Sequence, residues 1–134
     1  MYSSSIGEHA FVTCQGSAYG RFRHALDRGN TLAALSAATE LDHVGLVDAL
    51  ELLLLIARDG DERRFQTGAV RWAARYAREA GNVGPGEAQA VLGLLTMLTG
   101  PRKSQAAQAL AQLLDQQQYL PGGELLLRKA SDHR

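Results

Sequence analysis

The sequence predicts a small all-α protein, and three observations lead to this prediction. Glycine or proline stands at five of the boundaries between its helix-forming segments. No stretch alternates apolar and polar residues for more than a few positions, as a half-buried strand would. The connections between segments are short, roughly two to six residues, and such connections favour antiparallel neighbours. We therefore expect five to six helices in a compact bundle or a short stack of antiparallel αα-hairpins.

The expected helices follow one another with a start or stop signal at most of their ends. In chain order they cover residues 19–28, 31–41, 43–58, 62–80, 86–99 and 102–118, and residues 124–129 can add a last turn. The side chains that we expect to cap the second, third and fourth helices are Asn30, Asp42 and Asp61. Pro85 suits the first turn of the fifth helix. The glycines that can close a helix with left-handed backbone are Gly29, Gly60 and Gly81.

Length and composition indicate one folded domain. The chain has 134 residues, of which 46% are hydrophobic, and a chain of this size can bury a core without disulfides or metal. We expect a flexible N-terminal arm over residues 1–18 and a single helical domain over residues 19–134.

Charge and cysteine content bear on partners and location. Lys+Arg and Asp+Glu both total 14, so the net charge is zero and nothing global attracts the protein to nucleic acid or an anionic membrane. The single cysteine, Cys14, cannot form an internal disulfide, which suits a reducing cytosol. The longest apolar run, residues 52–57, is far shorter than the about 20 residues of a membrane span. We expect a cytoplasmic protein without membrane contact or affinity for duplex DNA.

The fifth expected helix is apolar nearly all round, which is typical of a helix buried at the centre of a fold. No charged residue follows Glu87 within it. The expected core includes nine large side chains of the third to sixth helices: Leu50, Leu53, Leu54, Trp72, Tyr76, Leu92, Leu95, Leu110 and Leu114.

Residues 35–53 resemble the helix-turn-helix of winged-helix and repressor proteins, which implies a recognition helix that binds DNA. The turn position that glycine usually takes holds Glu40, however, and the would-be recognition helix carries Asp48 and Glu51. Carboxylates have the wrong sign for contact with phosphates. We interpret the segment as an ordinary helical hairpin.

Four arginines of the fourth expected helix are spaced 7, 4 and 3 residues apart, which places them along one face: Arg64, Arg71, Arg75 and Arg78. Trp72 and Tyr76 lie on the adjoining face, and basic residues beside aromatic ones can bind single-stranded nucleic acid. The aromatic residues also have the spacing of a core stripe. If the third and fourth helices pair, Asp48 and Glu51 come opposite the arginines. Structural or solvated roles are therefore the favoured interpretation, and nucleic-acid binding is the alternative.

No other motif has a catalytic or metal-binding pattern. The glycine-rich segment 81–87 follows a helix rather than a strand and places Glu87 where an anion would lie, so we interpret it as a connecting loop. The four histidines have no second ligand at metal spacing, and Cys14 has no identifiable base partner. We expect no enzyme activity, cofactor or metal, and an active site assembled from dispersed residues stays open as a third hypothesis.

The sixth expected helix carries a row of glutamines at spacings of 3, 4 and 4: Gln105, Gln108, Gln112 and Gln116. From residue 88 to residue 123 the charged residues are only Arg102, Lys103 and Asp115. A glutamine face loses water more easily than a charged one, and the cores of interfaces are depleted in charge. Leu125 and Leu126 add apolar surface beyond this helix. The region is a candidate protein interface, with ordinary solvated surface as the alternative.

The segment from residue 23 to residue 76 combines a "DALEL" helix, an acidic turn and an "RWAARY" helix. In these features it resembles small Ala/Leu/Arg-rich actinobacterial proteins of unknown function. The resemblance covers roughly half of the chain. It implies a bacterial, cytoplasmic, helical protein, and it carries no activity and no functional residue.

Taken together, these patterns favour a non-enzymatic helical protein–protein interaction module that binds itself, as in a homodimer, or another protein. The alternative is an accessory nucleic-acid-binding protein that uses the arginine face of the fourth helix.

Overall fold

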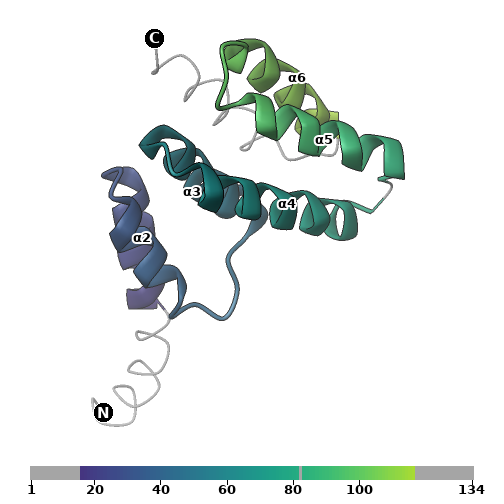
Figure 1. Ribbon diagram of the computed structural model, residues 1–134. Helices are drawn as coiled ribbons and strands as arrows, with labels where there is room; N and C mark the ends of the chain where they lie inside the picture. Colours follow the sequence, from purple (N-terminus) through teal and green to yellow (C-terminus); the bar gives the residue numbers. More distant parts are fainter. Residues whose placement is uncertain (1–15, 82, 117–134) are drawn as a thin grey trace, which may run out of the picture. The chain divides into compact units, whose positions relative to one another are not determined.

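The computed structural model describes residues 16–81 and 83–116 of the chain. These residues form six helices and contain no strand, which confirms the all-α prediction. The first helix is described over residues 16–27. The others are, in chain order, α2 (Thr31–Ala38), α3 (Leu46–Asp59), α4 (Glu62–Glu79), α5 (Pro85–Met97) and α6 (Lys103–Gln116) (Figure 1).

The contacts within the chain form two compact units, divided after Val44. The first unit contains the helix over residues 16–27 and α2, and the second contains α3 to α6. The single domain expected over residues 19–134 stays a prediction.

The first unit is a pair of helices joined through Gly29 and Asn30. Gly29 has a φ of 71°, and its N–H donates to the carbonyl of Leu26 at 3.0 Å. The N–H of Asn30 donates to the carbonyl of Ala25 at 2.9 Å. These two bonds form a Schellman ending, which needs the left-handed backbone that glycine adopts without strain. The Asn30 side chain then accepts a hydrogen bond from the N–H of Ala33 at 3.1 Å and caps α2, as predicted.

The first helix extends further towards the N-terminus than expected, because residues 16–18 are helical. Ala18, Phe22 and Leu26 are buried and follow one another at intervals of one turn. The apolar stripe that anchors this helix therefore includes a residue before Tyr19. The rest of the arm, Cys14 included, lies outside the described residues.

Two expected boundaries between α2 and α3 are also wrong. α2 ends at Ala38 rather than at residue 41, because the next three N–H groups bond to carbonyls three residues back, as in a 3₁₀-helix. α3 begins at Leu46 rather than at residue 43. Its N-cap is Gly45, and no side chain caps it, so the expected capping role of Asp42 is not fulfilled.

The other residues of the second unit that were expected to begin or end helices act as predicted. Gly60 and Gly81 have φ values of 81° and 88°. The Asp61 side chain accepts a hydrogen bond from the N–H of Arg64 at 3.2 Å and caps α4. Pro85 occupies the first turn of α5, where its missing N–H costs no helical bond.

The second unit is a stack in which each helix packs against the next. Among α3 to α6, backbone contacts join α3 to α4, α4 to α5 and α5 to α6, and they join no other pair of these four helices. Figure 1 shows two hairpins, with α5 and α6 above α3 and α4. A closed four-helix bundle would also join α3 to α6, so this unit is a short stack of hairpins.

α4 is hydrogen-bonded to the helices on both sides of it. The indole N–H of Trp72 donates to the carbonyl of Leu46 in α3 at 2.8 Å, in a buried position. The hydroxyl of Tyr76 donates to the Glu87 carboxylate in α5 at 2.9 Å. The rings of Trp72 and Tyr76 stack on each other with centroids 5.5 Å apart. These polar contacts give the α3–α4–α5 packing a specific register.

Seven of the nine expected core side chains are buried: Leu50, Leu53, Trp72, Tyr76, Leu95, Leu110 and Leu114. Leu54 and Leu92 are only half-buried, which corrects the expected core. Leu92 stands directly after the buried Val91. One residue turns a helix by about 100°, which carries the Leu92 side chain to the edge of the buried stripe of α5. Leu54 lies between the buried Leu53 and Leu55, and this account does not apply to it.

The expected burial of the fifth helix at the centre of the fold is corrected as well. The buried residues of α5, Val91 and Leu95, share one face with Leu98, which directly follows the helix. The opposite face is exposed along its whole length: Gly86, Gln89, Ala90, Gly93, Thr96 and Met97. Both α4 and α6 therefore pack against the same half of α5.

Candidate functional site

The four arginines of α4 are engaged to different degrees. Arg64, Arg71 and Arg78 are exposed, whereas the Arg75 side chain is 23% exposed. Arg75 Nε donates to the Glu79 carboxylate at 3.0 Å, and Arg64 Nε lies 3.8 Å from the Asp61 carboxylate. Within the part of the chain that the structure describes, Arg71 and Arg78 form no ion pair. The face therefore keeps two guanidinium groups that no described carboxylate neutralises.

The pairing expected across the α3–α4 hairpin does not form. Arg75 pairs with Glu79, one turn further along its own helix, and with neither Asp48 nor Glu51. Glu51 is buried in α3. An ion pair between residues four positions apart on one helix does not depend on how that helix packs against another. Arg75 therefore pairs with Glu79 of its own helix rather than with a carboxylate of α3.

The aromatic residues of α4 belong to the core. Phe65, Trp72 and Tyr76 are each at most 4% exposed. Binding of single-stranded nucleic acid combines phosphate pairing with stacking of bases on exposed rings. The arginine face of α4 can supply the pairing, but α4 presents no exposed ring beside it.

The glutamine row lies on the outer face of α6. Gln105, Gln108 and Gln112 are exposed. The opposite face is buried and is made of small and medium apolar residues: Ala106, Ala107, Leu110, Ala111 and Leu114. The side chain of Gln116 lies outside the described residues, and so do Leu125 and Leu126.

The exposed face of α5 adds a surface that the sequence analysis missed. No charged residue stands on it, and Met97 is 39% exposed there. The signal was weak, because α5 is apolar on both sides and only Gln89, Gly93 and Thr96 distinguish the outer face. We call this surface together with the exposed glutamines of α6 the α5–α6 outer face. Among the described residues of α5 and α6, Asp115 is the one that is both charged and exposed.

The segment that resembles a helix-turn-helix and the glycine-rich segment 81–87 are both ordinary connections between helices. Seven residues, 39–45, separate α2 from α3, whereas a helix-turn-helix joins its helices by a turn of about three or four residues. In the glycine-rich segment, Glu87 stands in the first turn of α5 and accepts the hydrogen bond of Tyr76. The segment is thus a connection whose acidic residue has a structural partner.

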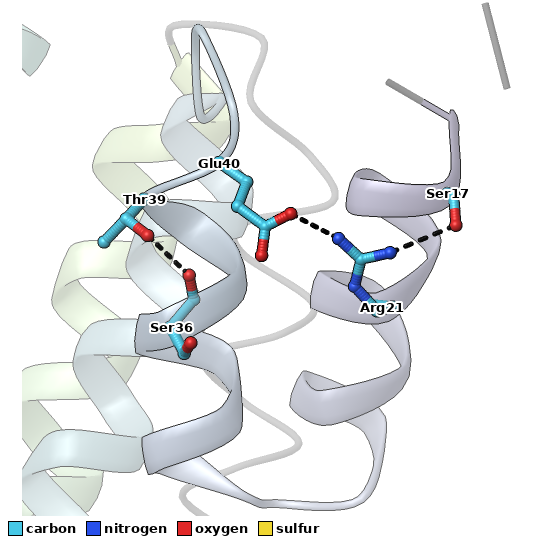
Figure 2. A network of polar contacts seen from close by, with 5 residues as sticks. All are labelled: Ser17, Arg21, Ser36, Thr39 and Glu40. Atoms are coloured by element: carbon cyan, nitrogen blue, oxygen red, sulfur yellow. Dashed lines mark hydrogen bonds and ion pairs between the residues drawn. The ribbon is translucent and has the colours of Figure 1, made fainter. Parts of the chain in front are cut away.

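The first unit contains an open groove that sequence reasoning also missed. Its volume is about 520 Å³, and its polar lining includes Ser17, Arg21, His24 and Arg28. Figure 2 shows the Arg21 guanidinium between Ser17, at 3.1 Å from its hydroxyl, and Glu40, with which it forms an ion pair. The charge of Arg21 is thus already balanced within the unit. The spacing of these side chains on one helix face was visible, but their position beside α2 was not.

A smaller pocket of about 270 Å³ lies where the α3–α4 turn meets the end of α5, beside Asp61, Glu62 and Thr99.

In residues 16–81 and 83–116, no three His, Cys, Asp or Glu side chains form a group that could hold a metal ion. Among the helices described, none combines the length and the apolar character needed to cross a membrane.

Comparison with known proteins adds no relative. No family model, no curated protein and no solved structure gives a significant match to this chain.

Proposed function

We propose that this protein is a non-enzymatic helical interaction module that associates with a second copy of itself through the α5–α6 outer face. The surface has two parts, the exposed side of α5 and the glutamine row of α6, on helices that pack against each other. In a two-fold dimer the same patch serves both subunits, so no second gene product is needed.

The observation that supports this proposal is the scarcity of charge on two packed helices that both have an open side. Gln105, Gln108 and Gln112 point away from the buried face of α6, and α5 exposes only uncharged residues. A solvated helix of a monomer usually carries charges on its outer face. Loss of water from glutamine, alanine, glycine and methionine costs less than from charged groups, which favours burial against a partner.

The test places like charges on the row. Gln108→Lys with Gln112→Lys should convert a dimer to a folded monomer, because the two copies would bring lysines together in a desolvated contact. Sedimentation or light scattering measures the mass, and circular dichroism checks the fold. Thr67→Lys with Ala74→Lys adds the same charge at exposed positions of α4 and should leave the mass unchanged. A monomeric wild-type protein at high micromolar concentration would contradict the proposal.

The second proposal for function is accessory nucleic-acid binding by Arg64, Arg71, Arg75 and Arg78. We rank it below self-association because the aromatic residues that would stack on bases are buried and Arg75 is bound to Glu79.

The resemblance to small actinobacterial proteins is the basis for proposing a bacterial origin, and the absence of a membrane-spanning helix among the described residues suits a cytoplasmic location.

A further inference from the structure

The solvent-facing side of α4 carries a second stripe, separate from the buried one. Thr67, Val70 and Ala74 are exposed, Ala77 continues the same line, and Val70 is 55% exposed. Their spacing of 3, 4 and 3 residues is the heptad spacing with which one helix packs along another. These side chains are small and uncharged, so a second helix could approach α4 closely along them.

Arginines border this stripe at intervals of seven residues. Arg71 and Arg78 each directly follow a stripe residue, Val70 or Ala77, and Arg64 stands seven residues before Arg71 on the same flank. Seven residues correspond to about 10.5 Å along a helix. A row with this period drifts only about 20° per heptad, so it stays beside the stripe over the whole length of α4. In paired helices, the positions that flank the apolar seam form the salt bridges that select the partner.

The charge of this flank is not balanced within α4. From Arg63 to Arg78 the helix contains no acidic residue. Arg71 and Arg78 form no ion pair with any described residue, and the contact between Arg64 and Asp61 is long, at 3.8 Å between half-exposed side chains. An uncharged seam with a positive border is complementary to a helix that has an apolar seam with a negative border.

We propose that the outer side of α4 is a docking surface for an amphipathic helix of another protein that carries acidic residues at seven-residue intervals. Nucleic acid fits less well, because the arginines have an aliphatic seam beside them rather than exposed aromatic rings. This surface is distinct from the α5–α6 outer face, so the inference does not depend on self-association.

The test uses the full-length protein and a labelled synthetic helical peptide of three heptads, with glutamates bordering an alanine and leucine seam. Fluorescence anisotropy should show binding that weakens as salt is raised. Arg71→Glu with Arg78→Glu should weaken binding of this peptide by about tenfold or more and should confer binding of the same peptide with lysines in place of its glutamates. Such a reversal of specificity cannot arise from unfolding. If the reversed protein folds poorly, Arg71→Gln with Arg78→Gln should still weaken binding of the acidic peptide.

Matched controls separate this surface from general charge effects and from self-association. Arg28→Glu with Arg102→Glu makes the same change in net charge at exposed positions off α4 and should leave peptide binding unchanged. Val70→Asp should abolish binding by placing a carboxylate in the seam. The mass in sedimentation should be the same for Arg71→Glu with Arg78→Glu as for the wild type. Equal binding by the wild type and the reversed variant overturns the proposal. The proposal is also overturned if the protein binds oligothymidylate but not the acidic peptide, and if this binding of oligothymidylate requires Arg71 and Arg78.

Discussion

At the scale of the residue, Gly68 leaves room on α4 for the Leu53 side chain of α3. A Cβ at this position would lie 2.8 Å from Cδ1 of Leu53, which is buried in α3. Glycine costs a helix about 1 kcal/mol relative to alanine, so its presence in the middle of α4 is offset by the close contact that it permits. Gly93 of α5 is the natural comparison, because a Cβ there would meet no atom within 4 Å.

We expect Gly93→Ala to raise the free energy of unfolding by about 0.5–1 kcal/mol, since it removes backbone freedom without a clash. Gly68→Ala gains the same helix propensity but forces Leu53 to move in a packed site, which costs about 1–3 kcal/mol. Gly68→Ala should therefore be less stable than Gly93→Ala in urea unfolding. Equal stability of the two variants would show that the Leu53 side chain is not packed against Gly68 as closely as described.

At the scale of the element, α5 shows that an apolar helix need not be buried on all sides. Val91 and Leu95 lie on the half that packs on α4 and α6, whereas Met97 belongs to the open half. The packed half and the open half of α5 differ little in side-chain polarity. The contribution of an α5 residue to stability should therefore depend on the half where it lies rather than on how apolar it is.

This difference can be measured within α5 alone. Leu95→Ala leaves a cavity at a fully buried position and should lower the free energy of unfolding by about 2–5 kcal/mol. Met97→Ala truncates a side chain that is 39% exposed, and the loss should be under about 1 kcal/mol. Chemical denaturation of both variants tests the assignment. Similar losses at the two positions would mean that the faces of α5 are assigned wrongly.

At the scale of the whole molecule, the second unit has the contacts of a self-sufficient fold. The hydrogen bonds from Trp72 to Leu46 and from Tyr76 to Glu87 both lie within it. So do the packing contacts of α3 with α4, of α4 with α5 and of α5 with α6. We expect residues 45–134, produced alone, to unfold in one cooperative transition. Helical circular dichroism and the fluorescence of the single tryptophan should lose their signals together. A fragment without a cooperative transition would favour the single domain over residues 19–134 instead.

Binding of duplex DNA is expected to be absent at physiological salt. The net charge is zero, and Asp48 in the first turn of α3 would repel phosphates if this helix entered a groove. A gel shift over a range of salt concentrations measures this. Tight binding that strengthens steeply as salt is lowered, and that requires Arg71 and Arg78, would contradict the expectation and support the nucleic-acid alternative.

Most helix ends and much of the core could be predicted from the sequence, because their causes are local. The Asn30 and Asp61 caps and the left-handed Gly29 and Gly60 act within a few residues of the chain. The predictions that failed at this level involve segments where no local side chain sets the end, as at Gly45 before α3. The exposure of Gln105, Gln108 and Gln112 also agrees with the sequence, since the buried stripe of α6 has the period of a helix.

Only the tertiary structure decided which half of α5 packs against other helices and which uncharged surfaces stay open. The open half of α5 and the second stripe of α4 follow from where α4 and α6 pack, and composition alone could not distinguish these faces. The same holds for the arginines, because the availability of a guanidinium group depends on its neighbours in space. Arg75 is bound to Glu79, whereas Arg71 and Arg78 keep their charge exposed. Helix periodicity is a property of the chain, but the choice of partner is a balance of packing and electrostatics between distant segments.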